Sequence, residues 1–342
     1  MAGDPRKKGD VAPRAFPAIL TSGERRPFEA TDSGRRNLAD AIASRDNPVT
    51  ARVIANRIWA GHFGYGLVRT LSNFGQLGER PTHPELLDYL AQSLQRDGWS
   101  LKSLHRRILL SATWQMSTHF NEAAASVDPE NRLWWRFNRR RLEVEALRDS
   151  VFAVAGTIDS QMGGTLLPTP NRQYVTSTAN VNPVIYDPPR RSIYLPVVRS
   201  ALYDVFQAFD FADPSVQSGR RETTTVAPQA LFLMNSDLVL KQTRSLARQL
   251  LDDASLDDSG RIERLYSRAL GRTPRTAETA RALAFLETYA QASTASGGTS
   301  SGTTAAGSVD AEQNAQAESA RERAWQSLCR AVLASNEFIY VE

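Results

Sequence analysis

The feature that most constrains the fold is an apolar stripe that recurs at helical spacing. Leu86, Leu90 and Leu94 lie four residues apart, so they share one face of a helix. Thr82 and Glu85 precede this stripe with the spacing of a capping box, in which each side chain bonds the backbone of the other residue. The pattern predicts an amphipathic helix that packs its leucine face into a core.

Helical periodicity recurs along most of the chain. Gly64 follows one periodic segment as a C-terminal stop signal, and Ser100 stands as an N-cap before another. In the segment after Ser100, the residues Leu101, Leu104 and Ile108 are expected on the buried side. Helices are predicted near residues 37–44, 50–64, 81–99, 101–116, 139–156, 197–209, 228–251, 261–271, 274–289 and 320–334.

Other segments lack this periodicity. Residues 1–34 are rich in proline, glycine and charge, which predicts an extended N-terminal arm. Prolines interrupt residues 163–196, and the stretch "RRSIYLPVV" (190–198) is predicted to hold a short strand. Residues 291–319 form a Ser/Gly/Thr/Ala tract typical of a flexible insertion. The sequence therefore predicts one mainly α domain over residues 35–342, with a proline-rich irregular middle and at most a short strand pair.

The composition argues against several protein classes. The formal net charge is only +4, and the arginines alternate with acids, so a dense basic stripe for nucleic acid is missing. A single cysteine, Cys329, excludes an internal disulfide, and we expect it to be a small buried residue. No apolar run reaches the length of a membrane span, and the charged start of the chain is not followed by the apolar stretch of an export signal. We expect a soluble chain.

The stretch "ENRLWWRFNRRRLEVEALRDS" combines aromatic and basic residues. Adjacent residues point different ways, so at most one of Trp134 and Trp135 is expected to be fully buried, with an arginine stacked on the other ring. On the predicted helix 139–156, Arg139 and Arg140 belong to a basic run that acids four residues further on would partly neutralise. The expected pairs are Arg139–Glu143 and Arg141–Glu145. A helix-packing node is favoured over a ligand platform, for which Arg139 and Arg140 are the candidate binding residues.

A second polar group lies in "GRRETTTVAPQALFLMN". Thr224 or Thr225 is expected to cap the helix that contains Pro228, and this capping is the structural interpretation. The functional interpretation adds Arg220 and Arg221 to the helix start, together with Gln229, as a pocket for an anion or a sulfated carbohydrate.

The stretch "ANRIWAGHFG" supplies the remaining candidates. Asn56 and Arg57 would orient a polar ligand, Trp59 would stack on it, and His62 would transfer a proton. His62 lies on an apolar helix face, where a hydrogen-bonded core histidine is favoured over a ligand contact, and Arg57 lies on a different face. His83, before a helix start, is the second weak catalytic candidate. The histidines lack the spacing of metal ligands and no cysteine pair assists them, so no metal site is predicted. Nucleophile-elbow and nucleotide-binding motifs are also missing, which favours a chain that is not an enzyme.

Several stretches in order resemble one known family. They include "NPVTARVIANRIWAGHFGYGLVRTLSNFG", "GERPTHPELLDYLA", "DGWSLKSLHRRILLSATWQMS", "DPENRLWWRFNRRRLEVEALRDS", "RETTTVAPQALFLMN", "RIERLYSRALGRTP" and "LASNEFIYVE". They are similar to domain of unknown function 1553, the C-terminal domain of large planctomycete proteins. The resemblance implies an upstream partner domain, an export signal and a c-type cytochrome region with haem c. This chain has no "CxxCH" site, so no cofactor is predicted in it, and a fragment or a split gene product is expected.

Three functions follow from these observations. The first is a non-catalytic partner-binding or structural module of a larger, envelope-associated protein or complex, whose partner is the missing upstream domain. The alternative is a hydrolase or redox enzyme that acts on a carbohydrate or another polar or anionic substrate. The third is weak nucleic-acid binding, which would require an unpaired arginine stripe.

Overall fold

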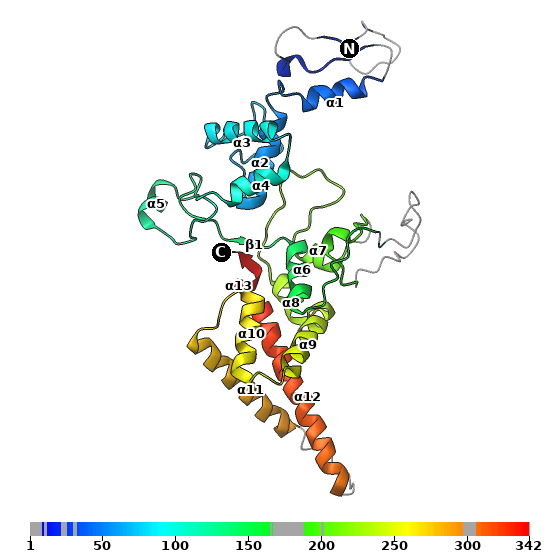
Figure 1. Cartoon of the computed structure of the whole chain (residues 1–342), viewed down its shortest axis with the longest axis vertical. Helices are drawn as coiled ribbons and strands as arrows, with labels where there is room; N and C mark the ends of the chain where they lie inside the picture. Colours follow the sequence, from blue (N-terminus) through cyan, green and yellow to red (C-terminus); the bar gives the residue numbers. More distant parts are fainter. Residues whose placement is uncertain are drawn as a thin grey trace. The chain divides into compact units, whose positions relative to one another are not determined.

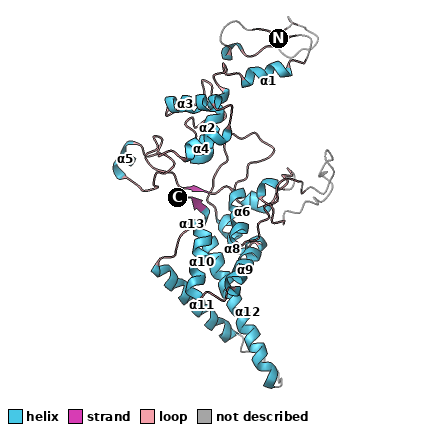
Figure 2. Ribbon diagram, viewed as in Figure 1, coloured by secondary structure: helices cyan, strands magenta, loops and turns pink. Residues whose placement is uncertain are grey.

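The computed structural model describes residues 9, 12–21, 26–29, 33–164, 166, 188–199, 202–296 and 306–341. Helices dominate these residues, and β1 (Arg140–Arg141) and β2 (Tyr340–Val341) form a short antiparallel pair (Figure 2). This confirms the mainly α fold predicted from the periodicity. Contacts divide the chain into two compact units, 1–138 and 139–342. The single domain expected over residues 35–342 stays a prediction, because a division by contacts does not test independent folding.

The first unit is built from helices that pack around an aromatic and aliphatic core. In its described part, an isolated antiparallel bridge joins Ala15 to Pro27 in the N-terminal arm before the helices begin. The core residues include Trp59, Phe63, Leu94 and Trp134. The elements are η1 (Ala18–Leu20), α1 (Arg35–Ala43), α2 (Thr50–Phe63), α3 (Pro84–Arg96), α4 (Leu101–Leu109) and α5 (Glu122–Val127) (Figure 1).

Local signals set most helix ends in this unit. Gly64 ends α2 in the left-handed conformation, with φ 84°, and the Ser100 hydroxyl accepts a hydrogen bond from the Ser103 N–H at the start of α4. The predicted capping box of α3 is wrong, because His83 is the N-cap and no side chain caps it. The Thr82 N–H donates to the Leu67 carbonyl instead.

Two further expectations for this unit need correction. Leu101 is 49% exposed rather than buried, because the first turn of α4 lies outside the core that Leu104 and Ile108 enter. Helix α4 also ends at Leu109 and not near 116, since hydrogen-bonded turns follow it from Ser111 onward. The apolar periodicity therefore predicted that Leu104 and Ile108 are buried. It predicted neither the exposure of Leu101 nor the end of α4 at Leu109.

The second unit packs its long helices around a separate core. Buried residues such as Leu147, Phe206, Leu246 and Trp325 come from α6, α7, α9 and α12 (Figure 1). Cys329 is also buried there, as predicted. The helices are α6 (Val144–Val154), η2 (Ser192–Tyr194), α7 (Asp204–Ala208), α8 (Ala227–Asn235), α9 (Asp237–Asp252), α10 (Asp258–Leu270), α11 (Thr276–Ser296), α12 (Ala306–Leu333) and α13 (Asn336–Ile339).

The helix predicted over residues 139–156 begins later than expected. Arg140 and Arg141 pair with Val341 and Tyr340, so they form a strand, and α6 begins only at Val144. The predicted helix 228–251 is likewise two helices, α8 and α9. They are separated at Ser236, whose hydroxyl accepts from the Val239 N–H as the N-cap of α9.

The strand predicted within 190–198 is also wrong, because η2 occupies Ser192–Tyr194. Arg148, fully buried on α6, donates to the carbonyl oxygens of Pro188 and Arg190, each at 2.8 Å. Asp149 accepts from the backbone N–H of Ser192 at 2.7 Å. These side chains occupy backbone groups that a strand would use to pair.

The Ser/Gly/Thr-rich tract differs from the expected loop at both ends. Residues 291–296 continue α11 and residues 306–319 belong to α12, while 297–305 lie outside the described residues. Alanine, the strongest helix former, is frequent in both helical parts. Most of the proline-rich middle, 167–187, also lies outside the described residues.

Candidate functional site

Asn56, predicted to orient a ligand, instead holds the loop that follows α2. It is fully buried, its amide nitrogen donates to the Val68 carbonyl, and its oxygen accepts from the Val68 N–H. A Cβ at Gly66 would come within 2.6 Å of the Asn56 amide nitrogen, so this position requires glycine. The "GYG" stretch is therefore explained by a close approach of backbone and side chain.

The other candidates on α2 separate from one another. Trp59 is buried and stacks on Phe63, so it belongs to the core. His62 Nε2 lies 2.7 Å from His105 Nδ1 on α4, a neighbour that the sequence spacing did not indicate. Arg57 is exposed and makes no hydrogen bond or ion pair with the described residues. The sequence predictions for these side chains as ligand contacts stay predictions.

His83 and the two tryptophans have local partners. His83 Nδ1 lies 3.0 Å from the Thr82 hydroxyl, at the N-cap position of α3. Trp134 is buried while Trp135 is only half-buried, and the Arg136 guanidinium lies 4.7 Å from the centre of the Trp135 ring. The predicted arrangement of one buried ring and one arginine-stacked ring is confirmed.

In the second unit, the basic residues are neutralised by partners other than those expected. Arg221 forms two hydrogen bonds with the Glu145 carboxylate, at 2.6 and 2.8 Å. Arg141 pairs with Asp210 at 2.7 Å, so the expected Arg141–Glu145 pair is wrong. The strand conformation of Arg141 removes the helical spacing on which that expectation depended. Arg140 lies in the same strand, and burial lowers the pKa of its guanidinium against the opposing effect of Glu143.

The polar group around Gln229 organises the start of α8. The Asp210 carboxylate accepts from the Thr224 N–H, the Thr224 hydroxyl and Arg141, and Gln229 reaches it at 3.5 Å. Burial raises the pKa of Asp210, but the hydrogen bonds from Thr224 and Arg141 outweigh it and hold that pKa below its usual range. The Gln229 side chain accepts from the Val226 N–H, the N-cap of α8. The expected threonine cap is therefore wrong.

Arg139, Arg140 and Arg220 complete the set of predicted binding residues. Arg139 is exposed at the boundary of the second unit, and Arg220 is exposed next to the half-buried Arg221 in the chain. All three take part in interactions with other groups. The structure thus places the predicted arginines of the second unit near β1 and the approach to α8, within an internally bonded network.

Helix α8 itself presents an apolar surface that our sequence analysis did not single out. Only Gln229 and Leu233 are buried, whereas Val226, Leu231 and Met234 are 47%, 56% and 51% exposed. Leu231 and Met234 lie three residues apart and so share one side of α8, while Val226 is the extended N-cap residue that precedes the helix. We call Val226, Leu231 and Met234 the α8 face. The signal in the sequence was a helix apolar all round, which normally indicates a buried helix.

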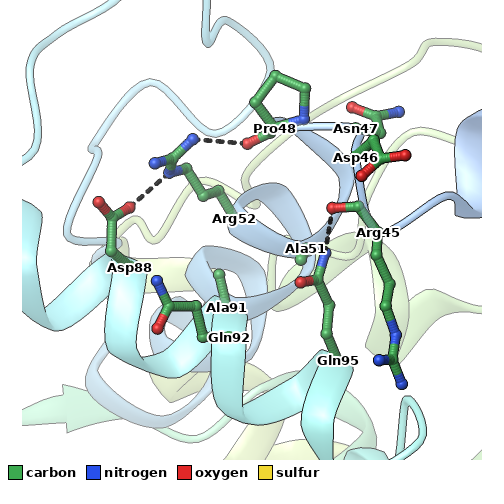
Figure 3. A pocket seen from close by; sticks show the side chains of 10 residues that line it. All are labelled: Arg45, Asp46, Asn47, Pro48, Ala51, Arg52, Asp88, Ala91, Gln92 and Gln95. Carbon is green, nitrogen blue, oxygen red and sulfur yellow. Dashed lines mark hydrogen bonds and ion pairs between the residues drawn. The ribbon is translucent and has the colours of Figure 1, made fainter. Parts of the chain in front are cut away.

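A second feature that the sequence did not indicate is an ion pair between α2 and α3. Arg52 Nε lies 2.5 Å from Asp88 Oδ1, and Arg52 Nη1 donates to the Pro48 carbonyl (Figure 3). The hydrogen bond with Arg52 holds the pKa of Asp88 below its usual value, so the carboxylate is charged near neutral pH. Both side chains are about two-fifths exposed.

Two pockets share this ion pair. The polar pocket, about 260 Å³, combines the turn before α2 with the face of α3 that carries Gln92 and Gln95. The apolar pocket, about 300 Å³, lies along the loop between α2 and α3. The polar pocket is lined by Arg45, Asp46, Asn47, Pro48, Ala51, Arg52, Asp88, Ala91, Gln92 and Gln95 (Figure 3), and the apolar pocket by Arg52, Val68, Phe74, Glu79, Pro81, Pro84, Leu87 and Asp88.

No group of three His, Cys, Asp or Glu side chains is placed to hold a metal ion among the residues that the structure describes. Within the same residues, no helix has both the length and the hydropathy needed to cross a bilayer.

Comparisons with known proteins give one match. Residues 34–286 match a family model described as PSD1, protein of unknown function (DUF1553), so the match covers more than half of the chain. No curated protein and no solved structure matches the chain.

Proposed function

The chain belongs to the PSD1 family of proteins of unknown function (DUF1553), and on that premise we propose that it acts as a partner-binding module. The observation that supports this proposal is the exposed α8 face, Val226, Leu231 and Met234. Contiguous exposed apolar surface on a soluble domain marks interaction sites, and each Å² of apolar surface that a partner removes from water contributes about 25 cal/mol.

The α8 face is presented on a fixed support. The Gln229 side chain bonds the N-terminal end of the helix, and Arg330 on α12 donates to the Met234 carbonyl at its C-terminal end. Leu233 enters the core of the second unit. A helix held at both ends loses little conformational entropy when a partner binds it, which favours affinity.

The chemistry of this surface selects the kind of partner. Its side chains are aliphatic and thioether groups, which offer no directional hydrogen bonds, so they suit an apolar protein surface better than a polar small molecule. We identify the partner with the polypeptide encoded immediately upstream, in frame or as a separate chain. The family resemblance supplies that identification, together with an envelope-associated location for the assembly.

The experiment is co-expression with that upstream polypeptide, followed by affinity purification. Leu231→Glu places a charge on the α8 face and is expected to abolish co-purification. Leu110→Glu, at the end of α4, is the matched control because Leu110 is 70% exposed and lies in the other unit. Equal recovery of the partner with Leu231→Glu and with the unmodified chain would contradict the proposal.

The two other functions stay predictions. A hydrolase or redox role would use His62 and His83, whose neighbours His105 and Thr82 are now identified. A nucleic-acid role would use the basic run, in which Arg141 is already paired with Asp210. Neither arrangement favours its function as specifically as the α8 face favours protein binding.

A further inference from the structure

We propose that the two pockets around the Arg52–Asp88 pair form a binding site for a neutral saccharide of one or two rings. This site lies in the first unit and is independent of the α8 face, which lies in the second. Together the pockets have the size of a small-ligand site.

The ion pair leaves hydrogen-bonding capacity unused on both side chains. Arg52 uses Nε and Nη1, and Asp88 uses Oδ1, so Arg52 Nη2 and Asp88 Oδ2 have no hydrogen-bond partner among the described residues. A hydroxyl group both accepts and donates, so one hydroxyl is able to bridge the guanidinium and the carboxylate. A peptide carbonyl or N–H fulfils only one of these roles. This difference favours a polyhydroxylated ligand over an extended peptide.

Helix α3 adds further groups with mixed hydrogen-bonding character. Asp88, Gln92 and Gln95 line the polar pocket from one helix face, at the spacing i, i+4 and i+7 (Figure 3). The Gln92 side chain is exposed and makes no hydrogen bond with the described residues, so both its amide donor and its acceptor are available. Gln95 donates to the Arg45 carbonyl and retains its acceptor oxygen.

The support of the polar pocket is fixed before any ligand binds. Asn47 is buried, and its amide donates to the Ile42 carbonyl at the end of α1 and to the Thr50 hydroxyl at the start of α2. The Asn47 oxygen accepts from the Val49 N–H. The turn that carries Arg45 and Pro48 is therefore held between two helices.

The charges of the site cancel, which selects a neutral ligand. Arg52 faces Asp88, and Glu79 in the apolar pocket pairs with Arg132 at 2.8 Å. Arg45 and Asp46 add one charge of each sign to the polar pocket. An anionic ligand would meet as much repulsion as attraction here, whereas a neutral ligand with many hydroxyls would not.

The apolar pocket supplies the complementary surface. Val68, Phe74, Pro81, Pro84 and Leu87 bring C–H groups and one aromatic ring next to the ion pair. A pyranose ring has hydroxyls around its rim and an apolar face of C–H groups, so it matches a wall of this kind beside a polar edge.

The loop that carries Phe74 is internally bonded. The Thr70 hydroxyl donates to the Asn73 carbonyl and accepts from the Glu79 N–H. Gly78 packs so closely on Asn73 that any Cβ would meet the Asn73 carbonyl oxygen. The wall of the apolar pocket is thus held in place by its own backbone.

The test is saturation-transfer NMR of the whole chain with a panel of neutral disaccharides at millimolar concentration. The panel contains cellobiose, maltose, mannobiose and N,N′-diacetylchitobiose, with glucuronic acid and N-acetyl-trialanine amide as the charged and peptide probes. At least one disaccharide is expected to receive saturation. Any two disaccharides that bind are expected to compete with each other for one site. The two other probes are expected to receive none.

Two substitutions in the site and one outside it complete the test. Asp88→Asn and Gln92→Ala are each expected to weaken binding of that disaccharide about tenfold, the loss expected for a hydrogen bond that involves a charged or unshared polar group. Glu322→Gln is the matched control, because Glu322 forms a similar exposed pair with Arg248 Nε at 2.9 Å in the other unit. Gln92 is exposed, so its loss should not affect folding even if Asp88→Asn does.

Three results would overturn the inference. They are the absence of saturation transfer to all four disaccharides, binding of a disaccharide that neither Asp88→Asn nor Gln92→Ala weakens, and transfer to the tripeptide amide alone. The Leu231→Glu substitution should leave saccharide binding unchanged, so failure of this inference is distinguishable from failure of the proposed partner-binding function.

Discussion

The side-chain amide of Asn56 forms two hydrogen bonds with the backbone of Val68, each 2.9 Å long. Asn56 lies on α2, and Val68 lines the apolar pocket twelve positions further along the chain. Asn56, which the sequence suggested as a ligand contact, therefore fixes the backbone of a residue in the wall of the apolar pocket.

Substitution of Asn56 is expected to destabilise the first unit. Asn56→Ala leaves the N–H and the carbonyl of Val68 buried without partners, at a cost of about 2 kcal/mol or more in the free energy of unfolding. Urea denaturation measures this loss. Arg57→Ala is the control, because Arg57 is exposed, and it should change stability by no more than about 0.5 kcal/mol. Equal stability of both variants would show that the two hydrogen bonds do not support the fold.

The ion pairs of Arg272 predict an acid-dependent contribution to stability. Hydrogen bonds from Arg272, and from the Arg275 N–H, lower the pKa of Glu278 from 4.5 to about 2. A carboxyl whose pKa is lower in the folded state stabilises the protein fully above its unfolded pKa, and this stabilisation is lost as the pH falls through the folded pKa. The relevant window therefore runs from about pH 4.5 down to about pH 2.

Glu278→Gln tests this contribution. The variant should melt at a lower temperature than the unmodified chain near neutral pH, and the difference should shrink as the pH falls toward 2. Thermal melts across this range, together with carboxyl NMR titration of Glu278, provide the measurement. Glu263→Gln on α10 is the control, since Glu263 forms no ion pair with the described residues. A difference in melting temperature that does not change with pH would contradict the assignment.

Cys329 is expected to be inert in the folded chain. Burial on α12 raises the pKa of its thiol to about 12, and the thiolate is the reactive form. At about pH 8, a thiol reagent such as Ellman's reagent should react only as fast as the protein unfolds, and at once in denaturant. Rapid labelling of the folded chain under the same conditions would place Cys329 at an accessible position.

Local signals in the sequence predicted much of the helical architecture. Gly64 and Ser100 set helix ends by their own backbone or side-chain chemistry, so neither position requires knowledge of distant residues. The burial of Leu90 and Leu94 follows in the same way from the period of the apolar stripe.

The errors arose where a distant segment decides the local structure. Arg140 and Arg141 have good helical spacing to Glu143 and Glu145, yet they pair with Tyr340 and Val341 near the other end of the chain. No periodicity within residues 139–156 indicates that partner. Pairing with β2 satisfies backbone groups of both strands, and this outweighs a weak helical preference.

The candidate sites were missed for a related reason. Arg52 and Asp88 are 36 positions apart and lie on different helices, so their pairing depends on how α2 packs against α3. The α8 face was missed because an apolar helix in a sequence is expected to be buried, whereas Leu231 and Met234 are exposed. Whether a given side chain is buried depends on the folded molecule, and a single sequence gives only the average burial of each residue type.

The central claim is that the α8 face contacts the upstream polypeptide, and hydrogen–deuterium exchange of the co-purified complex tests it most directly. Partner binding is expected to slow exchange of the backbone amides of α8, residues 227–235, and to leave those of α4 unchanged. Unchanged exchange in α8, with protection confined to another surface of the chain, would contradict the account.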